Sequence, residues 1–405
     1  SLVANWGDEG EKWAAQVKVQ LMHGPQRKEH FKSISSVDVI ITSYALVVRD
    51  LAEYQNLELN TLVLDEASMI RNADTQAAKA LRKLNAGARV ALTGTPVENA
   101  VRDLWSLYAF LLPGYLGSKE DFKNRYELAL AGAQPDENVL RRLRLRVEPF
   151  MIRRTKAQVA KDLPQKLEQT LWCQPSKLQK EAYQEILRQG VVKVDELEGG
   201  RARMQMLTVL LRLRQASCDL RLLGGESMAE RELSMLSAKL EMLIELLHEA
   251  RRGGHRVLVF SQFTKMLGFI KEALANEGIS FAYLDGATRD RSGEVKKFQA
   301  STGPDVFLIS LKAGGYGLNL TAADTVVHFD PWWNPAVEAQ ATDRAYRIGQ
   351  TKPVTVYKLI AKGTVEEKIL RLQERKRGVI GAAIGDEAEP MMTGLNAEDM
   401  RDLLS

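Results

Sequence analysis

Two adjacent carboxylates, Asp65 and Glu66, follow a short apolar run at residues 61–64, which we expect to form a β-strand. At the carboxyl end of a strand in a parallel sheet, one carboxylate can hold Mg²⁺. The next can orient a water molecule for attack on a phosphate. A turn that simply ends a strand produces the same residue pair, so the neighbouring motifs must decide between the two interpretations.

A second apolar run, at residues 89–92, is also followed by small polar residues, Thr93, Gly94 and Thr95. Hydroxyl groups at a strand end are suited to sensing a neighbouring phosphate, or to relaying its loss to another part of the chain. Because the carboxyl ends of parallel strands meet at one edge of a sheet, we expect the two strand ends to form one side of a pocket.

The second half of the chain carries a glycine-rich stretch with Gly315, Gly317 and Asn319. Glycines let the backbone approach a phosphate or a DNA strand closely, and this stretch has more of them than a plain turn requires. Further on, Arg344 and Arg347 are three residues apart, so on a helix both would point to one side. Guanidinium groups placed in this way can stabilise charge on a transferring phosphoryl group, although structural salt bridges are the alternative.

Strand-like and helix-like segments alternate in two blocks, which predicts an α/β fold with parallel sheets and crossover helices. The middle of the chain is mostly helical in pattern and is interrupted by Leu-Pro and Gly-Gly steps. We expect four parts: 1–100, 101–236, 237–384 and 385–405. We expect strands at 37–41, 61–64, 89–92, 257–260, 281–284, 306–309, 325–329 and 354–360. We expect helices at 75–84, from 239 to the glycines at 253–254, and from a capping box at 364–367 to about 377.

Composition excludes some classes of protein but does not identify a function. The 405 residues are 45% hydrophobic and 27% charged, and no apolar run reaches membrane-spanning length. We therefore expect an intracellular, cytoplasmic protein without a membrane partner. Two cysteines, Cys173 and Cys218, lack the close Cys and His neighbours of a zinc site and are predicted to be buried.

The net charge of +4 is small, but basic residues cluster between residues 140 and 156. Such clustering can neutralise nucleic-acid phosphates, and a solvated helix face is an equally good interpretation. The cluster contains Arg141, Arg142, Arg144, Arg146, Arg153, Arg154 and Lys156 against the single Glu148.

Taken in order, these motifs resemble those of a Swi/Snf-type ATPase of helicase superfamily 2, bacterial in character, over almost the whole chain. The stretch Asp-Glu-Ala-Ser at 65–68 is similar to motif II, 92–99 to motif III, and 257–263 to motif IV. The glycine-rich and paired-arginine stretches are similar to motifs V and VI. The most diagnostic stretches are Phe-Asp-Pro-Trp-Trp-Asn-Pro at 329–335, running into Arg-Ile-Gly-Gln at 347–350, and Phe-Met-Ile-Arg-Arg-Thr-Lys at 150–156.

The resemblance implies two RecA-like parallel-sheet lobes, the first incomplete, with helical insertions between them. It also implies ATP and Mg²⁺ as cofactors and double-stranded DNA as the partner, with a DNA-bound protein, such as a transcription or repair complex, as the object that is displaced. If the source is bacterial, the protein would be associated with the nucleoid.

The resemblance assigns roles to residues in three groups. The catalytic group is Asp65, which also holds Mg²⁺, with Glu66, Arg344 and Arg347. ATP binding and coupling fall to Thr93, Gly94, Thr95, Gly315, Gly317, Asn319 and Gln340. DNA contacts fall to Thr42, Ser43, Tyr44, Arg153, Arg154 and Trp333.

The sequence departs from the family in two respects. It has Ser68 where the family usually has Gln or His, and it contains no Gly-Lys dipeptide and so no P-loop. We expect roughly the first hundred residues of a motor lobe to be missing, on the scale of a small domain. The chain alone is then expected to hydrolyse ATP little or not at all, and to expose sheet edges. The alternative is a non-catalytic duplex-DNA-binding or regulatory protein derived from the motor. The Trp332-Trp333 segment disfavours an RNA helicase.

Overall fold

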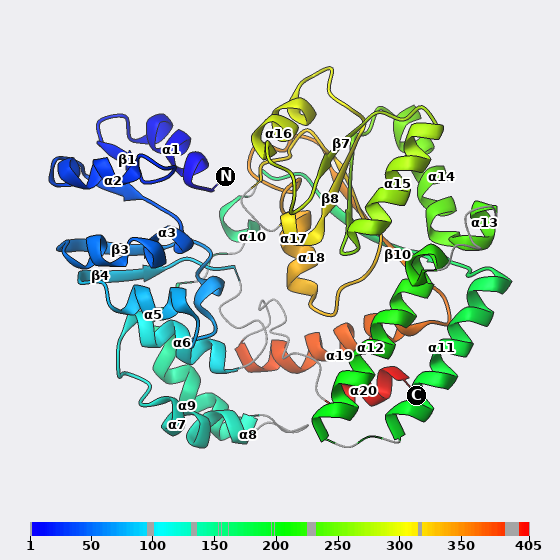
Figure 1. The fold of residues 1–405 in the computed structure, drawn as a ribbon, viewed down its shortest axis with the longest axis horizontal. Helices are drawn as coiled ribbons and strands as arrows, with labels where there is room; N and C mark the ends of the chain where they lie inside the picture. The colour runs from blue at the N-terminus through cyan, green and yellow to red at the C-terminus, as the bar shows by residue number, and fades with distance from the viewer. Residues whose placement is uncertain are drawn as a thin grey trace. The chain divides into compact units, whose positions relative to one another are not determined.

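The computed structural model (Figure 1) describes residues 2–94, 101–130, 136–152, 154, 156–160, 162–195, 197, 199–224, 232–314, 318–384 and 397–404. The chain divides into two compact units, which are described separately below. The first unit is Ser1–Ile152 with Val379–Gly394, and the second is Arg153–Gly378 with Leu395–Ser405.

The first unit contains two short parallel sheets. Strands β1 (Val19–Leu21) and β2 (Val39–Ile41) form one, and β3 (Leu59–Leu64) and β4 (Ala86–Ala91) form the other. Helix α5 (Gln76–Arg82) lies in the crossover between β3 and β4, and Thr75 accepts a hydrogen bond from the backbone of Ala78 to begin it. The strands predicted at 37–41, 61–64 and 89–92 and the helix at 75–84 are confirmed, each with one or both ends shifted by one to three residues.

The β3–β4 pair is apolar on both faces. On one face Leu62, Leu64 and Ala91 pack in a core with α5 and α6 (Val101–Leu111). On the other face Val63 and Val90, which are opposite each other in the register, are 52% and 40% exposed. Parallel strands normally have helices on both faces, so the described part of the chain covers only half of this sheet.

A second small core in the first unit is entirely helical. It joins α6 to α7 (Lys119–Phe122), a π-helical turn at Lys123–Glu127, α8 (Leu128–Leu130) and α9 (Glu137–Val147). The buried residues Tyr108, Phe122 and Leu143 belong to this core. The described residues of this part of the chain are thus mainly helical.

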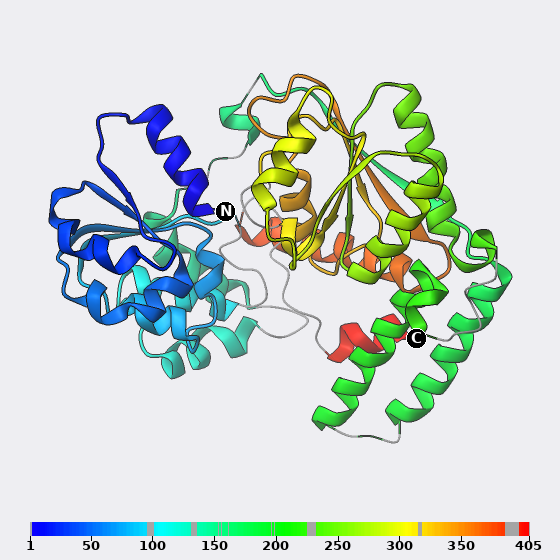
Figure 2. The same ribbon diagram turned by 45° about the horizontal axis from the view of Figure 1, so that its top comes forward.

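The second unit is built on one parallel sheet of six strands in the order β5-β10-β9-β6-β8-β7 (Figure 2). Its strands are β5 (Lys166–Cys173), β6 (Val257–Ser261), β7 (Phe281–Leu284), β8 (Val306–Ser310), β9 (Thr325–His328) and β10 (Val354–Ala361). Apart from β5, these strands match the predicted runs within one residue. The predicted α/β class with parallel sheets is therefore confirmed.

Helices cover both faces of this sheet, as the continuously apolar strands require. Helices α14 (Ala238–Arg252) and α15 (Thr264–Asn276) pack on the face that carries Val257, Val259 and Leu308. Helices α16 (Arg291–Gln299), α17 (Leu311–Gly314) and α18 (Pro335–Thr342) pack on the opposite face with Leu258 and Phe260.

The middle segment, expected to be mostly helical, also supplies the edge strand β5, which pairs with β10 along its whole length. Its sequence, Lys-Leu-Glu-Gln-Thr-Leu-Trp-Cys, mixes polar and apolar residues because an edge strand is half-covered, so no apolar run marks it. The remainder of the middle forms the hairpin of α11 (Lys177–Asp195) and α12 (Gly199–Cys218), which packs with α20 (Ala397–Leu404) and α19 (Val365–Ile384).

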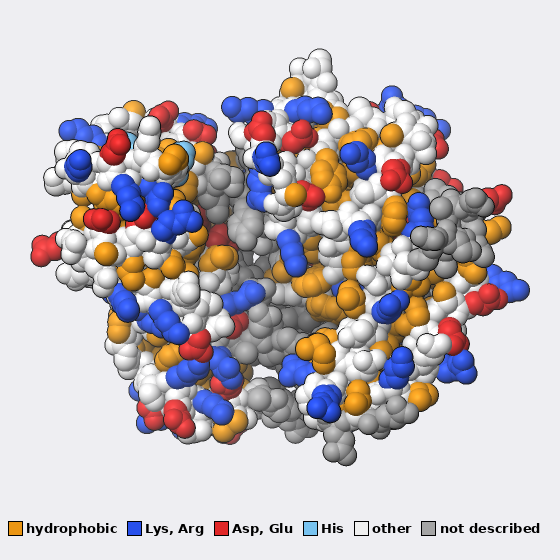
Figure 3. All heavy atoms as spheres, in the orientation of Figure 1, with side chains coloured by type: hydrophobic (Ala, Val, Ile, Leu, Met, Phe, Trp, Pro, Cys, Tyr) orange, Lys and Arg blue, Asp and Glu red, His pale blue; other side chains and the backbone are white. Residues whose placement is uncertain are grey.

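Among the remaining helices, α1 (Leu2–Trp13) is the longest. The others are short: α2 (Arg27–His30), α3 (Tyr44–Arg49), α4 (Leu51–Gln55), α10 (Lys156–Val159) and α13 (Leu233–Leu236). Within the described ranges, no helix is both long enough and apolar enough to cross a membrane. On the face drawn in Figure 3, Lys and Arg side chains are scattered among acidic and apolar ones and form no continuous stripe.

Candidate functional site

The two predicted strand ends of the first unit lie side by side. The backbone N–H of Leu92 donates to the carbonyl of Leu64 over 2.8 Å, and the N–H of Ala67 donates to the carbonyl of Leu92 over 2.9 Å. The parallel pairing of β3 and β4 therefore continues past both strands. This pairing brings the segment of Asp65 next to the segment of Thr93, as expected from the sequence.

Asp65 is held by three neighbours. The indole Nε1 of Trp6 donates to its Oδ2 over 2.8 Å, and the backbone N–H of Glu66 donates to its Oδ1 over 3.0 Å. The hydroxyl of Tyr44 donates to its main-chain carbonyl over 2.7 Å. Burial, with the charges of Asp65 and Glu66, raises the pKa of Tyr44, so this hydroxyl keeps its proton and remains a donor.

Glu66 adopts the left-handed backbone conformation, with φ 50° and ψ 52°. No other residue except glycine has a positive φ in the described ranges. This conformation costs a residue with a side chain about 1–2 kcal/mol, so the surrounding structure must impose it. The hydrogen bond from Ala67 to Leu92, immediately after Glu66, is part of that constraint.

The three residues predicted to touch DNA in the first unit follow β2, and each has a structural partner. The hydroxyl of Thr42 donates to the carbonyl of Met22 over 3.3 Å. Ser43 begins α3 by accepting a hydrogen bond from the N–H of Leu46, and Tyr44 holds the Asp65 loop. All three side chains are partly exposed. Their role in DNA binding remains a prediction.

Some predicted nucleotide contacts lie outside the described residues, namely Thr95, Gly315 and Gly317. Thr93 is half-buried and Gly94 is exposed at the end of β4. In the second unit, Asn319 is exposed after the glycine-rich stretch, and Gln340 is half-buried on α18.

Helix α18 ends at Thr342, before Arg344 and Arg347, so the two arginines do not share a helix face. The two arginines lie in a series of turns. The carbonyl of Arg344 accepts a hydrogen bond from the N–H of Leu320, and the side chain of Gln350 donates to the carbonyl of Ala345. These two hydrogen bonds hold the turns that follow α18. Arg344 is buried and Arg347 is half-buried.

Among the remaining predicted DNA contacts, Arg154 is exposed, Trp333 is half-buried and Arg153 lies outside the described residues. In the rest of the basic cluster, the four arginines of α9 are exposed, and Arg144 pairs with Glu148 at 3.5 Å.

Lys156, the last residue of the basic cluster, is already engaged within the second unit. Its ammonium group lies 2.5 Å from Oδ1 of Asp343 and donates to the carbonyl of Tyr346 over 2.7 Å. Burial lowers the pKa of Lys156, and the charge of Asp343 opposes that shift. The segment around Lys156, which precedes β5, is thus attached to the turns that carry the two arginines.

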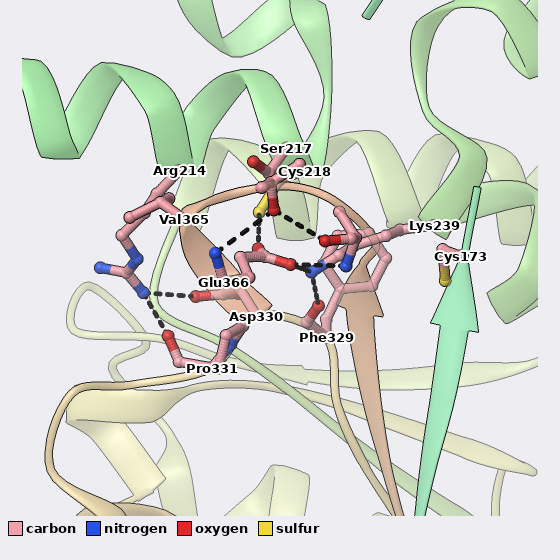
Figure 4. A network of polar contacts seen from close by, with 12 residues as sticks. Cys173, Arg214, Ser217, Cys218, Lys239, Phe329, Asp330, Pro331, Val365 and Glu366 are labelled. Atoms are coloured by element: carbon pink, nitrogen blue, oxygen red, sulfur yellow. Dashed lines mark hydrogen bonds and ion pairs between the residues drawn. The ribbon is translucent and has the colours of Figure 1, made fainter. Parts of the chain in front are cut away.

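A network of buried charges lies near the carboxyl ends of β6, β9 and β10 (Figure 4). Lys239, at the start of α14, lies 2.5 Å from Glu366, at the start of α19, and neither side chain is exposed. Lys239 also donates to the carbonyl of Phe329 over 2.9 Å. Burial alone would lower the pKa of Lys239, but the charge of Glu366 raises it above its usual value.

Arg214, from α12, forms the other half of this network (Figure 4). Its guanidinium group lies 3.7 Å from Asp330 and donates to the carbonyl of Pro331 over 2.5 Å. Burial raises the pKa of Asp330, and the charge of Arg214 together with the hydroxyl of Ser261 opposes that shift. The segment after β9, which carries the two tryptophans, is therefore held by a helix from the middle of the chain.

The two cysteines are buried and free, as predicted. Burial raises the pKa of Cys173 to about 11, so its thiol is not a reactive nucleophile. In the part of the chain that the structure describes, no three His, Cys, Asp or Glu side chains gather as a set of metal ligands.

Sequence reasoning missed Trp6, Arg214 and the Lys239–Glu366 pair. Trp6 is 59 residues from Asp65, and Arg214 is 117 residues from Pro331. A local pattern cannot reveal contacts over such separations. An arginine or lysine inside a helix is ordinarily exposed, so neither Arg214 nor Lys239 is marked by its position.

Two known protein domains match parts of this chain. Residues 1–222 match the SNF2-related domain, and residues 238–349 match the helicase conserved C-terminal domain. A putative ATP-dependent helicase/translocase, YwqA of Bacillus subtilis, is 38% identical over 416 residues, which cover 100% of this chain and 44% of that protein. An uncharacterised ATP-dependent helicase of Mycoplasma pneumoniae is 34% identical over 99% of this chain and 38% of that protein. The chain thus spans less than half the length of these relatives.

A more distant relative, human SWI/SNF-related matrix-associated actin-dependent regulator of chromatin subfamily A member 1, is 33% identical over 93% of this chain and 37% of that protein. Among solved structures, the Sulfolobus solfataricus SWI2/SNF2 ATPase core in complex with dsDNA is 34% identical. It aligns with a TM-score of 0.49 over 100% of this chain and 84% of that one.

Proposed function

Because this chain belongs to the SNF2-related family of ATP-dependent helicases, we propose that it forms most of a motor that hydrolyses ATP to move along double-stranded DNA. The observation that carries the proposal is the pairing of the β3 and β4 ends, which places Asp65 beside Thr93. In an α/β fold, this edge of the sheet is where a phosphate ligand binds.

Asp65 is the residue that would hold Mg²⁺. Oδ2 of Asp65 accepts a hydrogen bond from Trp6 and Oδ1 accepts one from Glu66, so each oxygen retains a lone pair for a cation. Mg²⁺ is usually held in such sites by one or two carboxylates, with water and phosphate oxygens completing its shell, and it would neutralise phosphate charge here. The arrangement around Asp65 therefore fits this ion.

The other residues contribute positioning and charge. Glu66, held in its left-handed conformation, orients the attacking water, and Trp6 and Tyr44 keep the carboxylate loop in place. Arg344 and Arg347 stabilise the negative charge of the transferring phosphoryl group.

DNA binding is assigned to Thr42, Ser43, Tyr44, Arg154 and Trp333. Contacts to phosphates do not depend on base sequence but depend strongly on salt. Replacing Arg154 by Ala should lower the slope of log affinity against log salt by about one, because one phosphate contact is lost. Lys119→Ala is the control, since that ammonium group pairs with Asp74. An unchanged slope in the Arg154 variant would contradict its assignment.

We further propose that this chain alone does not hydrolyse ATP, since it has no Gly-Lys dipeptide to cradle the phosphates. The exposed apolar face of Val63 and Val90 supports the proposal, because a further polypeptide segment is needed to cover it. In a completed motor, the output would be displacement of a protein bound to DNA. The second candidate, a non-catalytic DNA-binding protein, is favoured by the same absent dipeptide.

The test is phosphate release from ATP by this chain at low salt, with and without duplex DNA. The same assay is run on the chain extended by the P-loop segment of a relative. We expect no turnover by the chain and DNA-stimulated turnover by the extended chain, which Asp65→Asn abolishes and Asp74→Asn leaves intact. DNA-stimulated turnover by the chain alone would overturn the proposed need for a further segment. An inactive but folded extended chain would favour the non-catalytic candidate.

A further inference from the structure

The segment between β9 and α18 carries two adjacent tryptophans and begins the helix that leads to Arg344. Asn334 accepts a hydrogen bond from the N–H of Ala336, and Pro335 is the first residue of the helix, so the segment sets where α18 begins. Its conformation therefore affects both the proposed DNA contact at Trp333 and the start of the path to the arginines.

Arg214 meets this segment through Nη2 and through the face of its guanidinium group. Nη2 donates to the carbonyl of Pro331 and lies beside Asp330, while Nη1 donates to Oε1 of Gln262 over 2.9 Å. The plane of the group lies near both indoles, with Cζ 4.2 Å from the ring centre of Trp333 and 5.3 Å from that of Trp332. The Arg214 side chain is only 1% exposed.

The segment is also held from two other elements, which shows how closely its path is determined. The N–H of Trp332 donates to Oε1 of Glu338 on α18 over 2.7 Å, and its carbonyl accepts a hydrogen bond from Gln373 on α19. These contacts hold the backbone at Trp332. Arg214 both bonds to the segment and lies against the Trp333 ring.

We propose that Arg214 is a positioning residue that presents Trp333 to duplex DNA, so that the α11–α12 hairpin sets the geometry of this contact. The inference rests on the proposed function, in which Trp333 touches DNA. A lysine would keep the charge opposite Asp330. It would lose the flat group that stacks on the indole and donates in two directions at once.

The decisive variant is Arg214→Lys, because it leaves no unpaired buried carboxylate. Arg221→Lys is a matched control. Arg221 pairs with Asp219 at 2.6 Å and lies 4.1 Å from the ring centre of Phe269, so it combines the same two kinds of contact with partners outside the tryptophan segment. If Arg214→Lys does not fold, Arg214→Met combined with Asp330→Asn removes both charges together and serves as the second variant.

The position of Trp333 is read by fluorine NMR of the chain labelled with 5-fluorotryptophan. Variants Trp332→Phe and Trp333→Phe assign the two signals among the six tryptophans of the sequence. We expect Arg214→Lys to shift and broaden the Trp333 signal and to leave those of Trp6, Trp13, Trp105 and Trp172 in place. Arg221→Lys should move none of the six. An unmoved Trp333 signal in Arg214→Lys would overturn the positioning role.

Binding to a labelled duplex at low salt is measured in parallel by fluorescence anisotropy. We expect Arg214→Lys to weaken binding by about 5-fold, the lower end for one aromatic contact with a nucleic acid. It should have no further effect when Trp333 is already Ala, because Arg214 acts through that ring. Equal losses in both backgrounds would overturn the inference.

The two measurements separate the inference from the function on which it rests. If Trp333→Ala binds DNA as tightly as the original chain, the assigned DNA contact is wrong. A shifted fluorine signal in Arg214→Lys would then still report a positioned ring. If the signal stays in place while Trp333→Ala weakens binding, the DNA contact holds and the positioning role is wrong.

Discussion

The ammonium group of Lys239 lies 2.5 Å from the carboxylate of Glu366, and both side chains are completely buried. The residues are 127 positions apart in sequence, at the starts of α14 and α19, and the carboxylate also accepts a hydrogen bond from the N–H of Ala361 at the end of β10. Two helices and a strand of the second unit therefore meet at one ion pair.

Removing one partner of this pair should be far more harmful than removing both. Lys239→Met leaves a buried carboxylate without its cation and is expected to lower the free energy of unfolding by about 3–5 kcal/mol. Combining it with Glu366→Met should restore most of that loss, because two apolar side chains can fill the space. Urea denaturation measures both effects.

A surface ion pair, Glu367 with Arg371 on the first turns of α19, serves as the control for the buried pair, since the Arg371 side chain is 72% exposed. Arg371→Ala should change the free energy of unfolding by less than about 1 kcal/mol. A loss in Lys239→Met no larger than this would show that the buried pair is not a determinant of stability.

His328 predicts a dependence of stability on pH. It is buried at the end of β9, lies 2.9 Å from the hydroxyl of Thr342, and burial lowers its pKa to about 4. The unfolded chain takes up this proton near pH 6.5, but the folded chain resists it until about pH 4. The contribution of His328 to the free energy of unfolding is therefore fully present above pH 6.5. It is lost as the pH falls from 6.5 to about 4, by roughly 3 kcal/mol in total.

Thermal unfolding of the original chain and of His328→Gln between pH 7.5 and pH 4 tests this expectation. The difference between the two proteins should shrink as the pH falls, since the variant carries no proton-binding group at this position. His248, which is partly exposed and paired with Glu277, provides the control variant His248→Gln. Parallel curves for the original chain and the His328 variant would contradict the assignment.

The left-handed conformation of Glu66 can be tested by comparing two substitutions that both remove its carboxylate. Glu66→Gly relieves the backbone strain, whereas Glu66→Ala keeps it. The relief of strain stabilises the Gly variant, and the greater freedom of glycine in the unfolded chain offsets part of that gain. The net free energy of unfolding should therefore be higher for the Gly variant than for the Ala variant by about 0.5–1 kcal/mol. Denaturant midpoints compare the two, and a more stable Ala variant would mean that the local conformation differs from the one described.

Two helical glycines should respond in opposite ways to the same substitution. A Cβ atom on Gly190 of α11 would lie 2.5 Å from Cγ1 of Val209 on α12, whereas one on Gly268 of α15 would meet nothing within 4 Å. Gly190→Ala should therefore cost about 1–3 kcal/mol through crowding, and Gly268→Ala should add up to about 1 kcal/mol through helix propensity.

Val209→Ala provides the internal check on the first glycine, because it removes the methyl groups that the new Cβ would meet. In the Val209→Ala background, Gly190→Ala should cost much less than it does alone, and thermal unfolding of the four proteins measures the coupling. An equal cost in both backgrounds would place the crowding elsewhere.

Local sequence pattern determined much of the framework of this protein. The runs at 257–260, 281–284, 306–309, 325–329 and 354–360 all became strands, because parallel strands buried on both faces must be continuously apolar. The start of α19 was also predicted at Thr364. However, Thr364 accepts a hydrogen bond from Glu366, and Glu367 accepts one from Gly363, so the capping box itself is not formed.

Tertiary structure decided what such patterns cannot express. The edge strand β5 has no apolar run to mark it. The turns that carry Arg344 are held by hydrogen bonds that Leu320 and Gln350 donate to the carbonyls of Arg344 and Ala345. The roles of the predicted site residues stay predictions.

A sequence pattern reports which face of an element is buried, but it does not report which partner meets that face. Asp65 was predicted from two residues and a strand, whereas its neighbour Trp6 is visible only in the folded chain. Arg214 and Lys239 look like surface residues until packing encloses them and supplies a carboxylate to each. The sequence thus determined the sheets and the position of the carboxylates. Folding decided the contacts that hold them, because hydrogen bonds and ion pairs depend on distances between residues that are far apart in the chain.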